Sequence, residues 1–356
     1  MFHTLTVADL TQETEDCISI RLDVPQDLQE SFHYVPGQYL TFKLVRGGQE
    51  LRRSYSLCSH PSSSEWRVAV KRVPEGKFSG YVHEELQVGD KMEVMTPAGS
   101  FVRKDQKSNQ GARYVCFAAG SGITPILSII TETLEGDTEA EIDLFYGSRK
   151  TDSIIFKEEL EALKNRYLQR FQLHYVLSRE RLQSEWFYGR IDAEKSAHYA
   201  KYLFQPQAVD QYFLCGPESM IRAVEASLLE AGVEQEKISY ELFTAPGAVS
   251  VEQKAEVRHS LGQTESMVTI TLDGLDMTFI MDETDESILD AALHQGADLP
   301  YACKGGVCST CKARVKKGDV AMAVNYALEE DEVKAGYVLT CQAVPTDSTV
   351  AISFDE

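Results

Sequence analysis

The sequence predicts a multidomain protein in which an antiparallel β-barrel, an α/β domain with a parallel sheet and a small α+β domain follow one another. Its 356 residues are more than one hydrophobic core ordinarily organises, so two or three domains are expected. The residue pattern changes near Gly111, where short strands give way to alternating strands and helices, and again at a polar, Gly-containing stretch. We therefore predict domains at residues 1–107, 108–244 and 263–356, with a linker at 245–262.

The first domain contains short segments that alternate in polarity or are rich in β-branched and aromatic residues, as strands are. Turn residues such as Pro36-Gly37, Gly47-Gly48 and Pro97-Ala98-Gly99 separate these segments. Many short strands with frequent turns indicate a small antiparallel barrel. The strands are expected at 17–22, 39–44, 66–72 and 91–95.

The second domain alternates apolar strands with longer helices, which predicts a parallel sheet with helices on both faces. The third domain contains a hairpin around Asp273-Gly274, a helix, a cysteine-rich loop and two late strands. The expected strands are 114–119, 141–146, 172–177, 211–215, 267–272 and 277–280, and the expected helices are 124–134, 156–167, 218–231 and 287–295.

Composition and charge exclude several classes of function. The N-terminus lacks the basic and apolar segments of a secretory signal, and no run of about 18 apolar residues occurs, so we expect no membrane span and a cytoplasmic protein. A formal net charge of −20 argues against binding to nucleic acid. Residues 263–356 hold 6 Lys and Arg against 17 Asp and Glu, a net charge of −11. That surplus is either a solvated surface or an acidic face that steers a more basic partner.

Four of the eight cysteines are clustered: Cys303, Cys308 and Cys311 follow a C-x4-C-x2-C pattern, and Cys341 follows after 29 intervening residues. In a chain without a signal sequence, clustered cysteines indicate a metal or redox site rather than a disulfide. This is the plant-type ferredoxin spacing for a [2Fe–2S] cluster, in which each iron takes two protein thiolates. A structural zinc site is the alternative, although zinc usually takes two separate pairs of closely spaced cysteines.

A glycine-rich turn follows the first strand of the second domain. Gly120 and Gly122 allow a tight turn close to a phosphate, and Thr124 begins a helix whose N-terminus offers free N–H groups. The third glycine of the G-x-G-x-x-G fingerprint is absent, so this turn alone is a weak nucleotide signal. A second turn, Cys215-Gly216-Pro217, follows the apolar run 212–214 and precedes another helix.

Together with Tyr146-Gly147, these turns resemble the ferredoxin–NADP reductase superfamily, in which a G-x-G-x-x-P form occurs. The resemblance implies that Cys215 lies near the nicotinamide ring where hydride leaves; the alternative for a lone cysteine is a small, buried apolar residue. It places Ser178 and Arg179 where NADP-using relatives bind the 2′-phosphate, with Arg149 as another candidate. NADPH is therefore the expected donor and NADH the alternative, and either arginine is otherwise an ordinary surface cation.

Two motifs in the first domain resemble the flavin-binding segments of the same superfamily. The first is Arg53-Ser54-Tyr55-Ser56, whose side chains alternate between the two faces of a strand. The resemblance implies that Arg53 reaches a flavin phosphate, that Tyr55 packs on the isoalloxazine and that Ser56 lies near the reactive N5. Ser56 and Cys215 are thus the expected catalytic residues.

The second flavin motif is Gly76-Lys77-Phe78-Ser79, which precedes a helical stretch and matches the segment that meets the pyrophosphate. FAD is the expected flavin and FMN the alternative. Glu241-Leu242-Phe243, just before the linker, matches the family segment that ends near the flavin. Phe243 either covers the flavin ring, as the resemblance implies, or is a core aromatic residue.

The C-terminal segment resembles a plant-type ferredoxin domain, from the helix at 287–292 through Leu299-Pro300-Tyr301-Ala302-Cys303 to Cys311. This implies a β-grasp fold around the cluster. A flavin accepts an electron pair as hydride and releases electrons singly, so the expected order is NADPH, flavin, cluster and partner protein.

Nearly the whole chain resembles the reductase subunits of phenylacetyl-CoA epoxidase complexes, which act in phenylacetate degradation, most closely at 50–59, 118–127 and 285–312. The resemblance implies that the partners are the oxygenase subunits of a di-iron multicomponent monooxygenase in a bacterial cytoplasm. The alternatives are the reductase of another oxygenase or hydroxylase and, in a different class, a non-catalytic iron–sulfur redox sensor.

Overall fold

The computed structural model describes residues 2–104, 111–182, 184–243, 265–282 and 285–355. They form two compact units, Met1–Glu241 and Leu242–Glu356. The linker expected at 245–262 lies outside the described residues. In the described ranges no helix is both long enough and apolar enough to cross a lipid bilayer.

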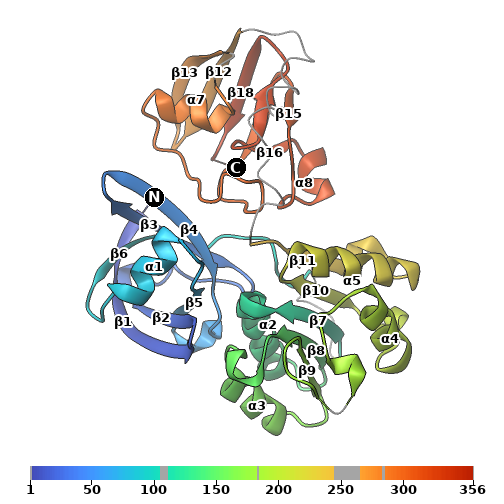
Figure 1. Ribbon diagram of the computed structural model, residues 1–356. Helices are drawn as coiled ribbons and strands as arrows, with labels where there is room; N and C mark the ends of the chain where they lie inside the picture. Colours follow the sequence, from blue (N-terminus) through green and yellow to red (C-terminus); the bar gives the residue numbers. More distant parts are fainter. Residues whose placement is uncertain (1, 105–110, 183, 244–264, 283–284, 356) are drawn as a thin grey trace. The chain divides into compact units, whose positions relative to one another are not determined.

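The N-terminal part of the first unit is a six-stranded antiparallel sheet curled into a barrel (Figure 1). The strand order is β4-β3-β6-β1-β2-β5, and a bridge between Leu57 and Val68 joins the two outer strands just after β4. Alternate side chains, such as Ile20 and Leu22 of β2, fill the barrel core. The elements are β1 (Phe2–Thr14), β2 (Cys17–Asp23), β3 (Tyr39–Arg46), β4 (Gln49–Ser56), β5 (Trp66–Lys71), α1 (Lys77–Glu84) and β6 (Lys91–Met95).

The rest of the first unit is a five-stranded parallel sheet with the order β11-β10-β7-β8-β9. Leu144 of β8 belongs to the core shared with α2 and α3, whereas its neighbour Phe145 stacks on Tyr199 of α4 with ring centroids 4.5 Å apart. Helices therefore cover both faces of the sheet (Figure 1). The elements are β7 (Arg113–Ala119), α2 (Ile123–Gly136), β8 (Glu141–Ser148), α3 (Lys157–Arg166), β9 (Phe171–Leu177), α4 (Ala193–Tyr202), β10 (Gln211–Cys215), α5 (Glu218–Glu230) and β11 (Ile238–Glu241).

Polar contacts hold the barrel against the parallel-sheet region. A single guanidinium nitrogen of Arg67 on β5, Nη2, contacts both carboxylate oxygens of Glu159 on α3, at 2.9 and 2.8 Å. The Ser128 hydroxyl of α2 donates to the Ser59 carbonyl at 2.6 Å, in a buried position. These contacts join the two parts of the first unit.

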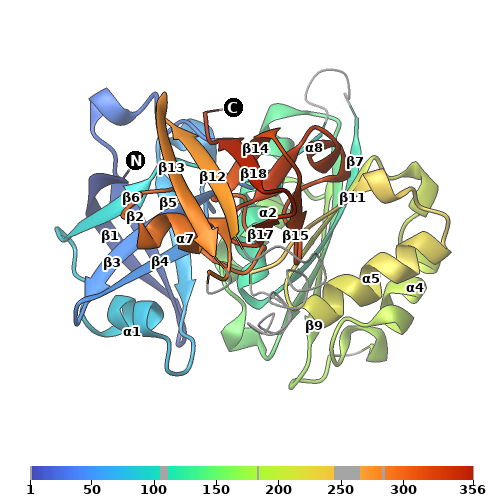
Figure 2. The same cartoon turned by 90° about the horizontal axis from the view of Figure 1, so that it is seen from above.

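The second unit is an α+β fold around a five-stranded sheet with the order β13-β12-β18-β14-β16. β12 and β13 form a long hairpin (Figure 2), whose turn has positive φ at both Asp273 and Gly274, as the Asp-Gly pair predicts. Helix α7 starts at the Ser287 cap and buries one face in the core. The elements are β12 (Glu265–Leu272), β13 (Leu275–Asp282), α7 (Ile288–His294), β14 (Lys312–Lys317), β15 (Val320–Met322), α8 (Glu330–Lys334), β16 (Tyr337–Leu339), β17 (Ala343–Pro345) and β18 (Thr349–Ser353).

The predicted fold class is confirmed in all three parts: an antiparallel barrel, a parallel α/β sheet and an α+β unit. β1, α4, β11 and α8 lie where the sequence analysis assigned no element, and five strands, β14 to β18, follow the cysteine loop where two were expected. β11 has a functional consequence, because it carries Glu241 to the end of the parallel sheet next to β10.

Candidate functional site

A crevice is expected where the strand order of the parallel sheet reverses. The chain runs from β7 to β8 and β9 on one side and then returns to β10 on the other side of β7. Such switch points at the carboxyl ends of strands are where open α/β sheets bind nucleotides. Both predicted turns lie here, because Cys215 pairs with Ala118 in the ladder between β10 and β7.

The two turns touch each other through glycine. A Cβ atom on Gly122 would lie 2.1 Å from the Cys215 carbonyl oxygen and 2.9 Å from the Gly216 nitrogen. Gly120 has a φ of +55°, and its carbonyl accepts a hydrogen bond from the buried Tyr146 hydroxyl at 2.9 Å. Both glycines are therefore required by the fold: Gly122 by close approach and Gly120 by conformation.

The N-terminus of α2 matches the prediction of free N–H groups only in part. No side chain caps its first N–H groups, and the Thr124 hydroxyl instead donates to the Ser121 carbonyl at 3.0 Å. Pro125 lies in the first turn, where no N–H is needed. The Ile123 N–H already donates to the Gly120 and Ser121 carbonyls and Pro125 has no N–H, so the first turn offers a phosphate fewer backbone donors than the sequence predicted.

Ser56 and Cys215, the predicted catalytic residues, come together with a third group that the sequence analysis did not assign, Glu241. The Ser56 hydroxyl at the end of β4 donates to Glu241 Oε2 at 3.2 Å, and Glu241 pairs with Cys215 in the ladder between β11 and β10. Ser56 is 3% exposed and Cys215 is fully buried. Contact between positions 56 and 241 depends on the tertiary fold, and the sequence signal for Glu241 was its place in the segment Glu241-Leu242-Phe243, which resembles a family segment near the flavin.

Burial controls the charges in this group. It raises the pKa of Glu241 to about 8, although the hydrogen bond from Ser56 acts in the opposite direction. Burial, followed by the nearby Glu241 carboxyl, also raises the pKa of the Cys215 thiol well above its ordinary value. At neutral pH both groups hold their protons, so this end of the sheet carries no side-chain anion from either of them.

The first flavin motif occupies the end of β4 as predicted. Tyr55 packs beside Phe42 and Phe78, with ring centroids 6.0 and 5.5 Å away. Arg53 is exposed, and its guanidinium donates to the Arg52 carbonyl at 2.7 Å. Ser54 shares a hydrogen bond of 3.0 Å with the Thr41 hydroxyl on the neighbouring strand. Ser54 therefore supports the sheet with its side chain, whereas Arg53 is presented to the surface.

The second flavin motif forms the start of α1. A Cβ on Gly76 would lie 2.4 Å from the Ser79 hydroxyl, which itself accepts from the Val73 N–H at 3.1 Å. Phe78 and Ser79 are buried, so their side chains serve the fold and the backbone of this turn faces outward. A pocket of about 270 Å³ lies against it; three cations and two carboxylates, from Arg46, Arg72, Lys77, Glu75 and Glu84, line it together with Val73, Gly76 and Gly80.

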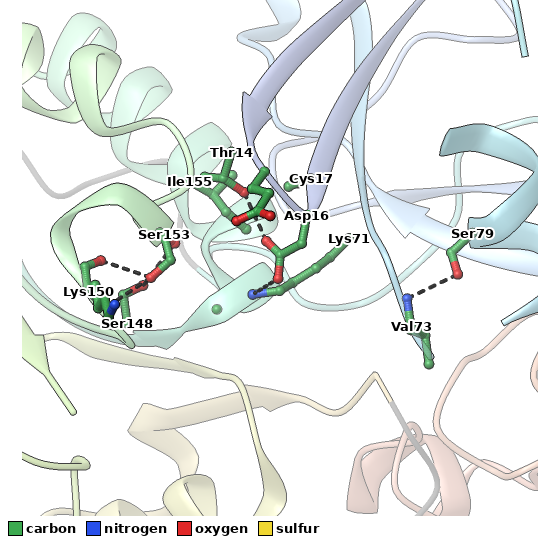
Figure 3. Close-up of polar contacts among 12 residues, drawn as sticks. Thr14, Asp16, Cys17, Lys71, Val73, Ser79, Ser148, Lys150, Ser153 and Ile155 are labelled. Carbon is green, nitrogen blue, oxygen red and sulfur yellow. Dashed lines mark hydrogen bonds and ion pairs between the residues drawn. The ribbon is translucent and has the colours of Figure 1, made fainter. Parts of the chain in front are cut away.

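Lys71, at the end of β5, is a second residue that the sequence analysis did not assign. Its ammonium nitrogen lies 4.0 Å from the place where a Cβ on Gly120 would be, so a cation from the barrel sits beside the glycine turn. It pairs with Asp16 Oδ2 at 3.4 Å, and the Thr14 hydroxyl donates to the other oxygen of that carboxylate at 3.0 Å (Figure 3). A cation beside the glycine turn that leads into α2 is suited to a bound phosphate.

The candidate 2′-phosphate residues follow two adjacent strands. The Ser178 and Arg179 N–H groups donate to the Ser148 and Arg149 carbonyls at 2.9 and 2.8 Å. Both arginines are exposed, and neither makes an ion pair with a residue in the described ranges. The nearby Glu180 carboxylate is occupied by the Thr151 N–H and hydroxyl, each at 2.8 Å, and these bonds lower its pKa. The arginines are thus free to take an anion.

Phe243, the last of the predicted flavin residues, belongs to the second compact unit and is 41% exposed. It is not a core aromatic residue. Its predicted role over the flavin ring stays a prediction.

The four clustered cysteines of the second unit gather around the loop between α7 and β14. Cys308 Sγ lies 3.1 Å from Cys303 Sγ, and the Cys341 thiol contacts those of Cys303 and Cys311. Thr340 ties the distant segment to the loop, because its N–H and hydroxyl both donate to the Cys311 carbonyl, at 3.1 and 3.0 Å.

The arrangement fits a two-iron cluster. Cys303 is half-exposed while Cys308, Cys311 and Cys341 are buried, and all four are free thiols. The Gly305 N–H donates to Cys303 Sγ at 3.3 Å, the type of bond that small loop residues allow. In the described ranges no three His, Cys, Asp or Glu side chains are arranged to hold one metal ion; a [2Fe–2S] cluster asks only for two sulfurs on each iron.

Comparisons with known proteins bear on each part of the chain. Residues 4–102 match the oxidoreductase FAD-binding domain, 117–226 the oxidoreductase NAD-binding domain and 270–346 the 2Fe-2S iron-sulfur cluster binding domain. The chain is 47% identical to a subunit of the 1,2-phenylacetyl-CoA epoxidase of Escherichia coli K12, over 99% of this chain and 98% of that protein. It is 32% identical to the ferredoxin reductase component of 3-ketosteroid-9-alpha-monooxygenase of Rhodococcus rhodochrous, over 98% and 96% of the two chains.

A solved structure shows the same fold over the full length. Phthalate dioxygenase reductase superposes with a TM-score of 0.59 and 22% identity, covering 99% of this chain and 98% of that one. The three domain matches, the two full-length relatives and this shared architecture agree with the predicted order of barrel, parallel sheet and iron–sulfur unit. The chain belongs to the family of NAD(P)H-dependent oxygenase reductases that join an FAD-binding domain, an NAD-binding domain and a C-terminal [2Fe–2S] domain.

Proposed function

We propose that this protein takes hydride from NADPH at the end of the parallel sheet and delivers single electrons to the oxygenase subunits of a phenylacetyl-CoA epoxidase. The observation that carries the electron-transfer part is the meeting of Ser56, Cys215 and Glu241 beside the glycine turn at the strand switch point. The observation that carries the partner is 47% identity, over 99% of the chain, to a component of such an epoxidase.

The cofactors supply the redox chemistry: FAD takes up an electron pair and gives electrons singly, and the [2Fe–2S] cluster carries one at a time. The residues of this chain bind and orient them. Arg53 and the N-terminus of α1 at Gly76 are suited to flavin phosphates, and Tyr55 offers an aromatic face. Cys303, Cys308, Cys311 and Cys341 are the proposed cluster ligands.

Ser56, Cys215 and Glu241 are suited to shaping the place of hydride transfer. With a pKa of about 8, Glu241 holds its proton at neutral pH and presents a neutral carboxyl to the Ser56 hydroxyl. A neutral group does not repel the negative charge that arrives with hydride. The buried Cys215 thiol is likewise uncharged and helps to exclude water.

The preference for NADPH rests on the ends of β8 and β9. Arg149 and Arg179 lie on adjacent loops without a carboxylate partner in the described part of the chain, and the Ser178 hydroxyl, which donates to the Ser148 carbonyl over a long 3.3 Å, lies between them in the sequence. Glu180, the acidic residue nearest to them in sequence, is held by Thr151. Two such guanidinium groups and a hydroxyl suit a phosphate monoester, which only NADPH carries at this position.

The partner proposal agrees with the charge of the iron–sulfur segment. Residues 263–356 carry a net charge of −11, which would steer association with a more basic protein surface. A bacterial cytoplasmic location belongs to the same proposal, since the epoxidase relative comes from Escherichia coli.

The deciding experiment mixes the FAD- and cluster-loaded protein with purified oxygenase subunits of a phenylacetyl-CoA epoxidase and follows NADPH oxidation with and without phenylacetyl-CoA. We expect NADPH consumption that depends on phenylacetyl-CoA and yields its epoxide. Rapid reduction of an artificial acceptor without product would keep the reductase and reject this partner, leaving another oxygenase as the candidate. An anaerobic NADPH titration that left flavin and cluster oxidised would refute the electron-transfer proposal itself and favour a redox sensor.

A further inference from the structure

Gln342, the residue after Cys341, is a polar side chain that the fold buries almost completely, with 1% of its surface exposed. Its backbone is fixed on both sides: its N–H donates to the Leu339 carbonyl at 2.8 Å, and its carbonyl accepts from the Ala323 N–H at 2.9 Å. Burying a primary amide is unfavourable unless hydrogen bonds replace those lost to water. The bonds that the amide makes therefore indicate what it does.

Both bonds lead to the cysteine loop. The Gln342 Nε2 donates to the Lys304 carbonyl at 2.8 Å and lies 3.6 Å from Cys341 Sγ, within reach of a hydrogen bond to sulfur. An amide nitrogen carries two hydrogens, so it can serve both acceptors at once. The opposite orientation of the amide would direct Oε1 at the Lys304 carbonyl oxygen and is excluded by that contact. Oε1 is buried without a partner in the part of the chain that the structure describes.

The surroundings keep the amide in place. A Cβ on Gly306 would lie 3.1 Å from Gln342 Cγ and 3.1 Å from Val324 Cγ2, and Gly306 has a φ of +74°. The cysteine loop thus packs directly on the Gln342 side chain, with no room for a larger residue at the point of contact. Lys304, whose carbonyl the amide holds, itself has a φ of +51° and adjoins the half-exposed Cys303.

We infer that Gln342 is a positioning residue that raises the reduction potential of the cluster by donating a hydrogen bond to the Cys341 sulfur while holding the Lys304 carbonyl beside Cys303. A donor aimed at a thiolate ligand stabilises the reduced cluster more than the oxidised one, because the reduced cluster carries more negative charge. Cys303 and Cys341 are the first and the last of the four proposed ligands in the sequence. One amide therefore contacts the segments that carry both of them. The inference rests on the proposed four-cysteine ligand set.

The test compares two variants of the FAD- and cluster-loaded full chain. Gln342→Met keeps an unbranched side chain of similar length but removes both N–H groups. Asn325→Ala is the matched control, because Asn325 holds the neighbouring turn through the Leu328 carbonyl and N–H, at 3.0 and 2.8 Å, rather than through a cysteine sulfur. The midpoint potential of the cluster is measured by reductive titration, followed by the electron paramagnetic resonance signal of the reduced cluster.

We expect Gln342→Met to keep its iron and sulfide content and its rate of flavin reduction by NADPH, and to shift the cluster potential to a more negative value. Asn325→Ala should leave the potential unchanged. An unchanged potential in Gln342→Met with full cluster content would overturn the inference. An equal shift in Asn325→Ala would also overturn it, because general loosening of the loop would then explain the effect.

A second measurement needs no variant and applies if Gln342→Met loses its cluster. The unsubstituted protein is produced with glutamine labelled with ¹⁵N in the side chain, and its reduced cluster is examined by pulsed electron paramagnetic resonance. A magnetic coupling from the labelled amide is expected, and its absence would refute the hydrogen bond to Cys341. Failure of the unsubstituted protein to assemble any [2Fe–2S] cluster would instead refute the proposed ligands and is recognised by iron analysis and visible absorbance.

Discussion

Burial of the Glu241 carboxyl destabilises the folded chain at neutral pH, and the substitution Glu241→Gln should remove this destabilisation. Burial raises its pKa from 4.5 to about 8, so between these values the folded chain binds a proton that the unfolded chain has released. The contribution of Glu241 to the free energy of unfolding therefore decreases as pH rises from about 4.5 to about 8 and is constant above that range. Glu241→Gln replaces the protonated carboxyl with a neutral group of the same shape, which can still accept from Ser56.

The size of the effect follows from the pKa shift. A pH of 7 lies about 2.5 units above the ordinary pKa of 4.5, and each unit corresponds to about 1.4 kcal/mol. Keeping the Glu241 carboxyl protonated in the fold therefore lowers the free energy of unfolding at pH 7 by at most about 3 kcal/mol. Because Glu241 is half-buried as a residue, solvent screening reduces this to roughly 1–2 kcal/mol. A unit of this size gains about 2–4 °C in melting temperature for each kcal/mol, so Glu241→Gln should melt about 2–8 °C higher at pH 7.

Heating the FAD-loaded protein and following the fluorescence of released flavin measures this difference between pH 5 and pH 9. The stabilisation by Glu241→Gln should be small at pH 5, grow up to about pH 8 and then stay level. The exposed Glu230 provides a matched control, since Glu230→Gln removes a carboxylate from the end of α5 without disturbing a buried contact. A melting-temperature difference that did not change with pH, or a destabilised Glu241→Gln at pH 7, would refute the assignment of a buried, protonated carboxyl.

Three further substitutions separate the proposed roles. Arg179→Ala should lower kcat/KM for NADPH about 10- to 100-fold, because a charge-assisted hydrogen bond of about 1.5–3 kcal/mol is lost, and should leave kcat/KM for NADH nearly unchanged. Equal losses with both donors would contradict its 2′-phosphate role. Lys71→Ala should weaken the binding of NADPH and of NADH by a similar factor of about 10, because both carry the pyrophosphate, and Lys71→Arg should restore most of the loss. An effect on NADPH alone would contradict the proposed contact of Lys71 with the pyrophosphate beside Gly120. Cys341→Ser should lose a normal cluster while flavin reduction by NADPH continues in anaerobic stopped-flow absorbance; one-electron delivery at the normal rate would contradict the four-thiolate ligand set.

Where the local pattern of apolar residues was clear, the sequence was sufficient to predict the element. β10 has the same bounds as the apolar run predicted for it, since a strand buried on both faces needs no alternation. β1 was not assigned because a register shift between Val7 and Asp9 breaks its period of two. α4 was not assigned because it buries Ser196, Tyr199 and Ala200, which form no aliphatic stripe.

The residues of the candidate site fall into the same two groups, those that a local pattern predicts and those that only the fold brings together. The glycine turns and the cysteine spacing are local devices, because a turn or a loop imposes its requirement on neighbouring residues. Glu241 and Lys71 act on partners that are remote in sequence: the hydrogen bond between Ser56 and Glu241 spans 185 positions. Neither residue type is unusual at a strand end, so the residue type alone does not distinguish them from surface charges, and their contacts come from the assembled fold.

The two unassigned residues also explain why the barrel and the parallel sheet must keep one mutual arrangement. Ser56 and Lys71 come from the barrel, whereas Glu241 and Gly120 come from the parallel sheet, so each contact crosses the same internal boundary. The ion pair between Arg67 Nη2 and Glu159 crosses it as well, with distances of 2.9 and 2.8 Å to the two carboxylate oxygens. Contacts at separate places along this boundary join the barrel and the parallel sheet, which form one compact unit. The proposed hydride-transfer residues therefore depend on both parts of that unit.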